Sequence, residues 1–447
     1  MCLHDHDATP TLPPAALSRR NVIAGAAVLA GVTAGGIASA SSAAAAGGAH
    51  PATTGADHGH GGRPGTVGSL VVEGGSIVDP LTGHVVHDGV VVVRNGTVLA
   101  VGSRDATRRA VAAVGSRARR IDASGRWVVP GLVDVHVHAN ALADARALLL
   151  AGATTVRSGS STFYQDVAMR SLPERAPGLA PRMRAAGVFV SPQLGDSALA
   201  DPELAPLAAL PNGVTSTSDI AHVTRVNVKR GVDVVKTRAN PRAGLAEQDP
   251  RELVYDREQL SAVVRAAKGR PVLCHAYSAE GIDGAVRAGV RSIEHGVFVS
   301  DRTIAEMARR GTHFTPTLAA ISGMIGSSDP VLDARGREYT PILMRAVREA
   351  HERGVTVVAG TDSFGTEVAP IGSEVRLLVE AGLTPLDALR AATTSAARLL
   401  GWSRRVGRLL PGGAGDLLVV DGSPLDDGGA CERVRVVVAQ GVVVRAA

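Results

Sequence analysis

Hydrophobic and polar positions divide the chain into two kinds of segment. Apolar strand-like runs alternate with helical segments through the middle of the sequence, whereas short valine-rich runs broken by turns occupy both ends. Short apolar runs bounded by turn residues predict strands, and their alternation with helical spacing predicts βα units. The valine-rich runs lie at 69–72, 89–94, 98–101, 126–129, 416–421 and 434–444.

The middle of the chain predicts eight βα units. Helical segments between the strands include 279–288, 301–310 and 344–353. Eight such units are typical of a (β/α)8 TIM-like barrel, and a doubly wound open sheet is the alternative. Polar residues at the C-terminal strand ends favour the barrel, because barrel active sites lie at that end. The expected strands are 132–138, 154–157, 183–190, 233–237, 272–277, 292–297, 312–318 and 355–361.

The strand-rich flanks predict a small composite β-sandwich domain that both chain ends build together. We expect an α/β protein with the N-terminal part of the β domain at 68–129, the barrel at 130–400 and the C-terminal part of the β domain at 401–447. A chain of 447 residues is long enough for a barrel and a smaller partner domain.

Residues 1–46 resemble an export signal of the twin-arginine type. Arg19 and Arg20 precede an apolar, glycine-interrupted run that reaches Ala38, and small residues follow up to Ala46. A run of about 17 residues is short for a permanent span. We expect cleavage, no stable membrane span afterwards, and a secreted or cell-envelope location; a Sec signal or a short anchor is the alternative. Residues 47–67, rich in Gly and His, predict a disordered linker.

Composition and charge exclude several classes of protein. A hydrophobic fraction of 45% excludes a disordered chain, and three cysteines without metal or redox spacing exclude a disulfide scaffold. The formal charge of +5 comes from scattered residues, and only 2% of the chain is aromatic. Bases would have few side chains to stack on, so we expect no nucleic-acid partner. The sequence leaves open whether the protein forms a homo-oligomer.

Four histidines and one aspartate stand at the ends of the expected barrel strands. His136 and His138 end the first strand, and because alternate strand residues face the same way, both imidazoles face the barrel mouth. His275 ends the fifth strand, His295 the sixth and Asp362 the eighth. Imidazoles and carboxylates are ligands of divalent metals such as Zn²⁺. The pattern therefore predicts a metal site.

Lys236 ends the fourth expected strand. Only three of the 47 basic residues are lysines, so a lysine at this mouth indicates chemistry that a guanidinium cannot perform. A buried lysine favours its neutral amine, which can react with CO2 to give a carbamate able to bridge two metals. A lysine that snorkels from the strand end is the alternative.

Six motifs resemble those of the amidohydrolase superfamily, in particular its imidazolonepropionase-like and prolidase-type (Xaa-Pro dipeptidase-like) branch. The resemblance runs from about residue 69 to the C-terminus and implies a (β/α)8 barrel beside a composite β domain. The motifs are PGLVDVHVH at 130–138, GATTVR at 152–157, IEHG at 293–296, GTD at 360–362, GLTPLDAL at 382–389 and GGAGDLLV at 412–419.

The resemblance also implies a mononuclear or binuclear zinc-type site, and two zinc ions would use the full ligand set. Asp362 would have two roles: it would bind one metal, and it would act as the general base for a bridging water. The branch usually has Asp where this chain has Ser158, which we interpret as lost support for a ligand rather than a lost ligand. The implied ligands are His136, His138 and Asp362 for one metal, His275 and His295 for the second, and carbamylated Lys236 as the bridge.

Residues after the fifth strand bear on the reaction. Deaminases of the superfamily commonly carry Glu three residues after the strand-five histidine, where this chain has Ser278, so ring deamination is not expected. The lysine-bearing branch includes dipeptidases and relatives that act on N-acyl and ester substrates. We therefore expect hydrolysis of an amide C–N bond in a small molecule, a dipeptide or an N-acyl amino acid. Tyr277 is either a hydrogen-bond donor to the oxyanion or a core tyrosine.

Two other functions stay open. An imidazolonepropionase-like hydrolase of a cyclic amide or ester is one, although Lys236 argues against it because true imidazolonepropionases lack this lysine. A non-catalytic metal-binding protein of the same fold is the other, although every ligand position is filled. Arg157 and Arg238 stand at strand ends and could pair with a substrate carboxylate. Asp134 shares the inward face with His136 and could orient it.

Overall fold

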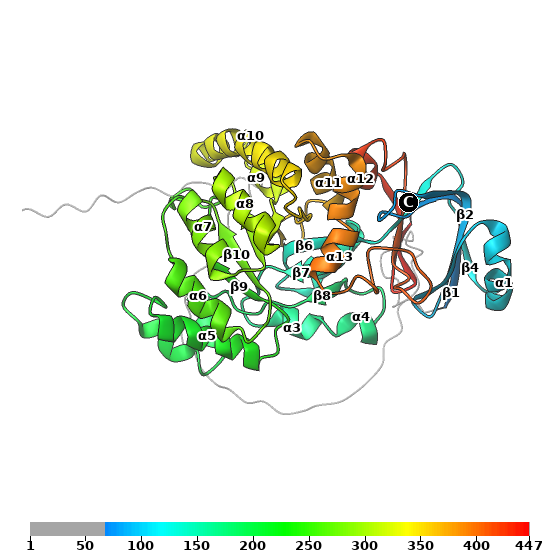
Figure 1. Cartoon of the computed structure of the whole chain (residues 1–447). Coiled ribbons are helices and arrows are strands. Elements are labelled where there is room, and N and C mark those ends of the chain that lie inside the picture. The colour runs from blue at the N-terminus through cyan, green and yellow to red at the C-terminus, as the bar shows by residue number, and fades with distance from the viewer. Residues whose placement is uncertain (1–67, 447) are drawn as a thin grey trace, which may run out of the picture. The chain divides into compact units, whose positions relative to one another are not determined.

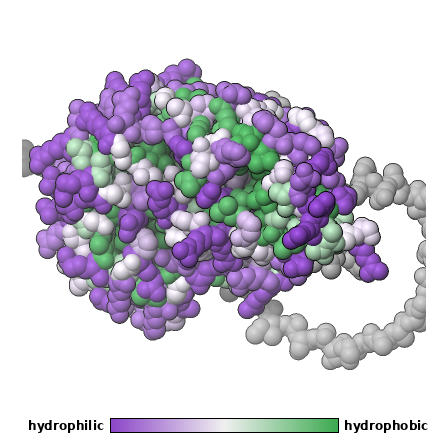
Figure 2. All heavy atoms as spheres, turned by 45° about the vertical axis from the view of Figure 1, so that its right-hand side comes forward, coloured by the Kyte–Doolittle hydropathy of each residue, from purple (hydrophilic) through white to green (hydrophobic). Residues whose placement is uncertain are grey.

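The computed structural model describes residues 68–446 of the chain (Figure 1). The predicted export signal (1–46) and the predicted linker (47–67) lie outside the described residues. Within residues 68–446, no helix combines the length and the hydrophobicity that a membrane span needs. The face drawn in Figure 2 is mainly hydrophilic, with hydrophobic patches between the polar side chains.

Strands from both ends of the chain pair in one eight-stranded sheet. The order is β16-β15-β14-β5-β1-β2-β3, with β4 parallel to β1. In Figure 1 the red C-terminal strands accordingly lie beside the blue N-terminal ones. That these strands form a separate sandwich domain stays a prediction. Their bounds are β1 Ser69–Val78, β2 Val85–Arg94, β3 Thr97–Gly102, β4 Arg119–Asp122, β5 Trp127–Pro130, β14 Leu417–Val420, β15 Val434–Ala439 and β16 Val442–Ala446.

The middle of the chain contributes eight parallel strands in two four-stranded sheets. Their orders are β13-β6-β7-β8 and β12-β11-β10-β9. Isolated parallel bridges link the two sets, from Val190 to Thr237 and from Phe314 to Val357. The bounds are β6 Leu132–His138, β7 Ala153–Ser158, β8 Arg182–Arg184, β9 Val235–Arg238, β10 Val272–Ala276, β11 Ser292–His295, β12 His313–Thr315 and β13 Ser363–Phe364.

Only β6 has its predicted bounds, and the other seven strands differ by one or more residues; the expected strand 312–318, for example, is regular only over β12. The expected strands 183–190 and 355–361 depart furthest from the structure. The expected strand 183–190 is regular only over β8, because Gly187 adopts a left-handed φ of 69° and interrupts the ladder. Within the expected strand 355–361, only Val357 forms a bridge, to Phe314 of β12. Regular pairing begins at β13, which pairs with β6. Asp362 lies between these two parts with a φ of 56°, which a continuous strand does not accommodate.

Helices alternate with the parallel strands, and their ends follow the capping residues. Ser278 and Ser300 cap the N-termini of α7 and α8, which end at Gly289 and Gly311 with left-handed φ, so the predictions 279–288 and 301–310 are confirmed. The expected helix 344–353 is the last part of the longer α10, which begins after the N-cap Asp329.

The helix bounds are α1 Arg104–Val114, α2 Leu142–Leu150, α3 Gln165–Met169, α4 Leu172–Arg175, α5 Thr217–Lys229, α6 Arg257–Ala266, α7 Ala279–Ala288, α8 Asp301–Arg310, α9 Leu318–Ser322, α10 Pro330–Glu352, α11 Ile371–Glu380, α12 Pro385–Ala391 and α13 Thr394–Leu399. Short 3₁₀ turns are η1 Gly195–Ala200, η2 Ala205–Ala209 and η3 Gly428–Glu432.

The strand pairing explains how the polar strand ends come together. β6 follows β5 across Gly131 and pairs with β13 on one side and β7 on the other. β10 lies between β9 and β11. All these strands are parallel, so their C-terminal ends lie on one side of their sheets, over a core that the helices cover.

Candidate metal centre

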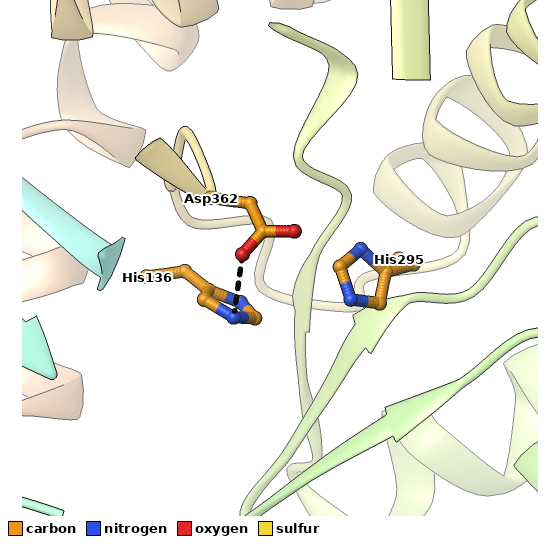
Figure 3. Close-up of side chains that lie close together, drawn as sticks. All are labelled: His136, His295 and Asp362. Carbon is orange, nitrogen blue, oxygen red and sulfur yellow. Dashed lines mark ion pairs between the residues drawn. The ribbon is translucent and has the colours of Figure 1, made fainter. Parts of the chain in front are cut away.

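The first half of the cluster forms where β6 and β13 lie side by side. The backbone N–H of Asp362 donates to the carbonyl of His136 at 2.8 Å, which holds the carboxylate over the end of β6. Asp362 Oδ1 lies 3.3 Å from His136 Nε2 and 3.2 Å from His138 Nε2. The ligand atoms of His136, His295 and Asp362 all lie within 4.8 Å of one another (Figure 3).

The second half comes from β9, β10 and β11. Lys236 Nζ lies 3.0 Å from His136 Nε2. The ring of His295 has its centroid 5.3 Å from that of His136 and 4.4 Å from that of His275. The structure therefore brings all six predicted metal-ligating residues into one cluster, although they come from four strands and the turn before β13.

Hydrogen bonds fix which nitrogen of His136 and of His138 is free to bind a metal. His136 Nδ1 lies 2.7 Å from a carboxylate oxygen of Glu294, which can only accept when ionised, so Nδ1 carries the proton. His138 Nδ1 contacts the carbonyl of Ser160 at 3.3 Å and its hydroxyl at 3.1 Å. In both rings Nδ1 is engaged, so Nε2, the atom that faces Asp362, is the nitrogen left for a metal.

The same argument applies to the two histidines of β10 and β11. His295 Nδ1 lies 2.8 Å from the hydroxyl of Thr317, whose own proton goes to the Pro316 carbonyl at 2.7 Å. His295 therefore donates from Nδ1 and keeps its lone pair on Nε2. His275 donates from Nε2 to the Pro241 carbonyl at 2.9 Å, which leaves the lone pair on Nδ1. In each of the four imidazoles, one nitrogen is thus engaged by the protein and the other is left for a ligand.

The electrostatics of the cluster fit a divalent cation. Burial lowers the pKa of His136 to about 4 and that of His295 to about 3, so both rings are neutral at pH 7. The Nε2 lone pair of His136 then faces an oxygen of Asp362 at 3.3 Å with no proton between them. A cation removes this repulsion, and neutral imidazole with carboxylate is a donor set that zinc prefers.

A buried ion pair that the sequence analysis did not single out supports His136. Arg157 donates from Nη2 to Glu294 at 2.8 Å, and its Nε and Nη1 bond to the Val135 carbonyl and the Ser292 hydroxyl. Glu294 in turn holds His136 Nδ1. Arg157 is therefore fully engaged inside the protein and does not meet a substrate. The sequence offered one indication of this pair: Ser292 and Glu294 are two residues apart on β11, so both polar side chains lie on the same face of the strand.

Asp134 and Ser158 occupy the layer below the ligands. Asp134 accepts from the backbone N–H groups of His136 and Thr361, both at 3.1 Å, and from the Thr361 hydroxyl at 2.7 Å. It thus holds the backbone of both ligand-bearing segments rather than an imidazole. Burial raises the pKa of Asp134 to about 7. The Ser158 hydroxyl is buried and has no hydrogen-bond partner within the described part of the chain.

Several backbone positions of the cluster are constrained by close approach or by unusual conformation. His295, Thr317 and Asp362 have left-handed φ values of 69°, 54° and 56°, a region that non-glycine residues seldom adopt. Gly159 lies against the ligands, because a Cβ there would be 2.8 Å from His136 Cδ2 and from His138 Nε2. Strain of this kind concentrates at functional sites.

Lys236 and Tyr277 are both buried beside the histidines. Burial lowers the pKa of Lys236 to about 8, so a substantial fraction of the amine is neutral near physiological pH. The Tyr277 ring stacks on His295 with centroids 4.9 Å apart and planes 9° apart. Burial raises the pKa of the Tyr277 phenol well above its usual value, so it keeps its proton and remains a donor.

Removing the positive partner of Glu294 is expected to destabilise the fold. Burial alone would raise the pKa of Glu294, but Arg157 and His136 outweigh burial and hold it well below 4.5. We expect Arg157→Met to lower the free energy of unfolding at pH 7 by about 3–5 kcal/mol, because it leaves a buried unpaired charge. Denaturant titration measures this change.

The double variant Arg157→Met with Glu294→Gln is the control, and it should recover part of the loss because the buried negative charge is gone. The depressed pKa of Glu294 means that the pair stabilises the fold above pH 4.5 and loses its effect as pH falls further. Equal stability of Arg157→Met and the wild type at pH 7 would contradict this role.

Comparison with known proteins places this arrangement in a family. The model of the amidohydrolase family matches residues 127–444, which include all six clustered residues. The chain belongs to the amidohydrolase family. Members of this amidohydrolase family generally depend on divalent metals, and the cluster supplies candidate ligands.

Individual amidohydrolases show where the similarity lies. Ochratoxinase of Aspergillus niger is 27% identical over 217 residues, 47% of this chain and 45% of its own, so the match spans less than half of that relative. Imidazolonepropionase of Mesorhizobium japonicum is 27% identical over 377 residues, 75% of this chain and 87% of its own.

A crystal structure of a putative prolidase from Bifidobacterium longum superposes on 85% of this chain and 95% of its own, with a TM-score of 0.71 and 28% identity. The predicted resemblance to amidohydrolases of the prolidase and imidazolonepropionase type is therefore confirmed.

Proposed function

We propose that this protein is an exported, metal-dependent amidohydrolase that cleaves the amide C–N bond of a dipeptide or an N-acyl amino acid. The observation that carries the proposal is the cluster of four imidazoles, each with one nitrogen engaged by the protein, in which ligand atoms of His136 and His295 lie within 4.8 Å of one another and of Asp362. The likeness to a putative prolidase and to ochratoxinase supports amide hydrolysis. The eight parallel strands would close into a (β/α)8 barrel, with the sheet of both chain ends as a composite β domain.

Two zinc ions would fit the donor set. His136, His138 and Asp362 would hold one, and His275 through Nδ1 with His295 through Nε2 would hold the other. When bound, such ions activate water and polarise the scissile carbonyl. The neutral Lys236 amine would react with CO2 to form a carbamate and release one proton, and the single negative charge of the carbamate would be shared by its two oxygens.

The chain's own residues would carry the proton transfers. Asp362 would take a proton from the attacking water and deliver it to the nitrogen of the departing amine, so that the amide bond breaks without releasing an amide anion. Tyr277 keeps its proton and lies against His295, so it would donate to the oxygen that becomes negative in the tetrahedral intermediate.

A hydrolysis screen tests the proposal. The mature protein, loaded with Zn²⁺, is incubated with a panel of dipeptides and N-acyl amino acids, and amine release is measured. We expect turnover of at least one member, lost on treatment with a chelator and restored by Zn²⁺. A cyclic amide and an ester belong in the panel, since turnover of these alone would replace amide cleavage by the alternative hydrolase. Metal binding with no turnover at all would favour a binding protein.

Export is expected to depend on the arginine pair. Changing Arg19 and Arg20 together to Lys should stop a reporter fused after residue 50 from leaving the cytoplasm, because the twin-arginine route requires both guanidinium groups. The reporter's location is measured by fractionation, with the unchanged signal as the control. Export of the doubly changed signal at the normal level would refute the twin-arginine route.

A further inference from the structure

Arg238 is a buried cation without an anion. Its side chain is the last of β9 and only 7% of the residue is exposed, yet its Nε is buried with no hydrogen-bond partner. No carboxylate of the described residues forms an ion pair with Arg238, whereas the equally buried Arg157 has Glu294. An unpaired buried charge is costly, so proteins keep one where a ligand completes the pair.

Arg238 stands one layer above the metal cluster on the same face of β9. Lys236 and Arg238 are two residues apart, so their side chains share one face. Both lie over the ring of Phe189, with Lys236 Nζ 5.7 Å and the Arg238 guanidinium carbon 5.4 Å from its centroid. The guanidinium of Arg242, an exposed residue of the following loop, lies 5.9 Å from the same ring. Two guanidinium groups thus gather around one aromatic ring beside the cluster.

The loop that carries Arg242 is held in place from several sides. Asn240 donates to the Glu252 carbonyl and accepts from the backbone N–H of Tyr277, and Pro241 accepts from His275. Arg335 of α10 donates to four carbonyls of the loop, those of Ala243, Leu245, Ala246 and Gln248. The two cations are therefore presented by a fixed backbone, as a binding site requires.

The electrostatic surroundings of Arg238 also fit a binding site for an anion. Burial, followed by the positive charge of Arg242, lowers the pKa of Arg238 to about 10; the phenol of Tyr255 acts in the opposite direction, and no carboxylate does. The side chain remains protonated at neutral pH. A bound carboxylate would compensate both guanidinium groups and could accept a bidentate hydrogen bond.

We propose that Arg238, assisted by Arg242, binds the free carboxylate that lies next to the scissile amide and so makes the enzyme specific for substrates with a terminal carboxylate. The proposal rests on the function proposed above. Two residues along a strand span about 6.6 Å. In the substrate, three covalent bonds separate the scissile carbonyl carbon from the carboxylate carbon. Together with one hydrogen bond from the carboxylate to the guanidinium, this distance is comparable to the spacing between Lys236 and Arg238 along the strand.

Matched substrate pairs test the proposal. N-Acetyl-L-methionine and leucyl-proline are each compared with the corresponding primary amide at the C-terminus, on the Zn²⁺-loaded wild type, Arg238→Gln and Arg238→Lys. We expect the wild type to prefer the acid about 100-fold or more in kcat/KM, mainly through KM. Arg238→Gln should bring the ratio of acid to amide close to one, and Arg238→Lys should keep an intermediate preference. Arg265→Gln removes an exposed charge from α6 and is the matched control.

A binding measurement separates this proposal from the proposed reaction. Calorimetry with N-acetyl-L-methionine on chelator-treated protein should give binding that Arg238→Gln weakens about 30-fold or more and Arg265→Gln does not. Thermal stability of unliganded Arg238→Gln should be no lower than that of the wild type, since no internal pair is lost.

Arg238-dependent binding without turnover of any pair would refute the hydrolase function and leave the carboxylate site standing. Equal turnover of acids and amides by the wild type would overturn the carboxylate site and leave the hydrolase function standing. An unchanged ratio in Arg238→Gln, or the absence of any binding to the wild type, would also overturn the carboxylate site.

Discussion

Replacing Lys236 with arginine is expected to remove nearly all amide hydrolysis. Lys236 Nζ is buried 3.0 Å from the Nε2 lone pair of His136, and its lowered pKa makes the neutral amine accessible. Arginine keeps a permanent positive charge, is larger, and cannot form the carbamate. We expect kcat/KM to fall on the order of 10³-fold and the bound metal to fall from two ions to at most one per chain. Kinetics and elemental analysis on the same preparation measure both.

Two further variants make the result specific. Lys229→Arg is the matched control, because Lys229 is exposed and arginine can keep its ion pair with Glu203; it should behave like the wild type. Lys236→Ala leaves space for a small carboxylic acid, so added formate or acetate should restore part of the rate. Two metals and an undiminished rate in Lys236→Arg would end the bridging role of Lys236.

Replacing Asp362 with asparagine is expected to have a comparably large effect for a different reason. The amide has nearly the same shape, so the backbone bond from residue 362 to the His136 carbonyl should persist. It cannot take a proton from water, and loss of a general base costs about 10²–10⁴-fold in kcat. It also removes the negative charge beside His136 and His138, so metal affinity should fall.

The pH profile distinguishes the two contributions of Asp362. Burial alone would raise the pKa of Asp362, but the positive charge that His136 and His295 gain in acid outweighs burial and holds this pKa well below 3.8, so the wild type should lose activity only in acid. Asp362→Asn, saturated with Zn²⁺, should be slow at every pH. Asp105→Asn, which changes an exposed acid of α1, is the control and should retain full activity. Full kcat in zinc-saturated Asp362→Asn would exclude Asp362 as the base.

Elements with strong local signals were predictable from the sequence. β6 has the predicted bounds because its valine-rich run, of which all but the last residue is buried, directly follows a proline and a glycine. The helices α7 and α8 begin at serine caps and end at glycines. The β13 region could not be predicted from the sequence, because the left-handed conformation of Asp362 depends on contacts with β6, more than two hundred residues away in sequence.

The candidate ligands could be predicted, but most of their partners could not. Residue type and position at a strand end were enough for the four histidines, Lys236 and Asp362. The role of Glu294 depends on Arg157 and His136, which lie on other strands, and local spacing carries no information on such pairs. The isolation of Arg238 from any acid is likewise a property of its three-dimensional surroundings alone.

The pairing of β5 with β14 has a consequence for synthesis of the protein. β5 leads directly into the strand that bears His136 and His138, and its partner Leu417 pairs with Pro130 from a position 287 residues later in the chain. At about 5–20 residues per second, β5 leaves the ribosome about 15–60 s before that partner exists. During this interval the edge of β5 that later pairs with β14, with Trp127 and its valine neighbours, is unpaired and hydrophobic. Such an edge favours aggregation, so we expect a chaperone that shields nascent strands to raise the yield of folded enzyme.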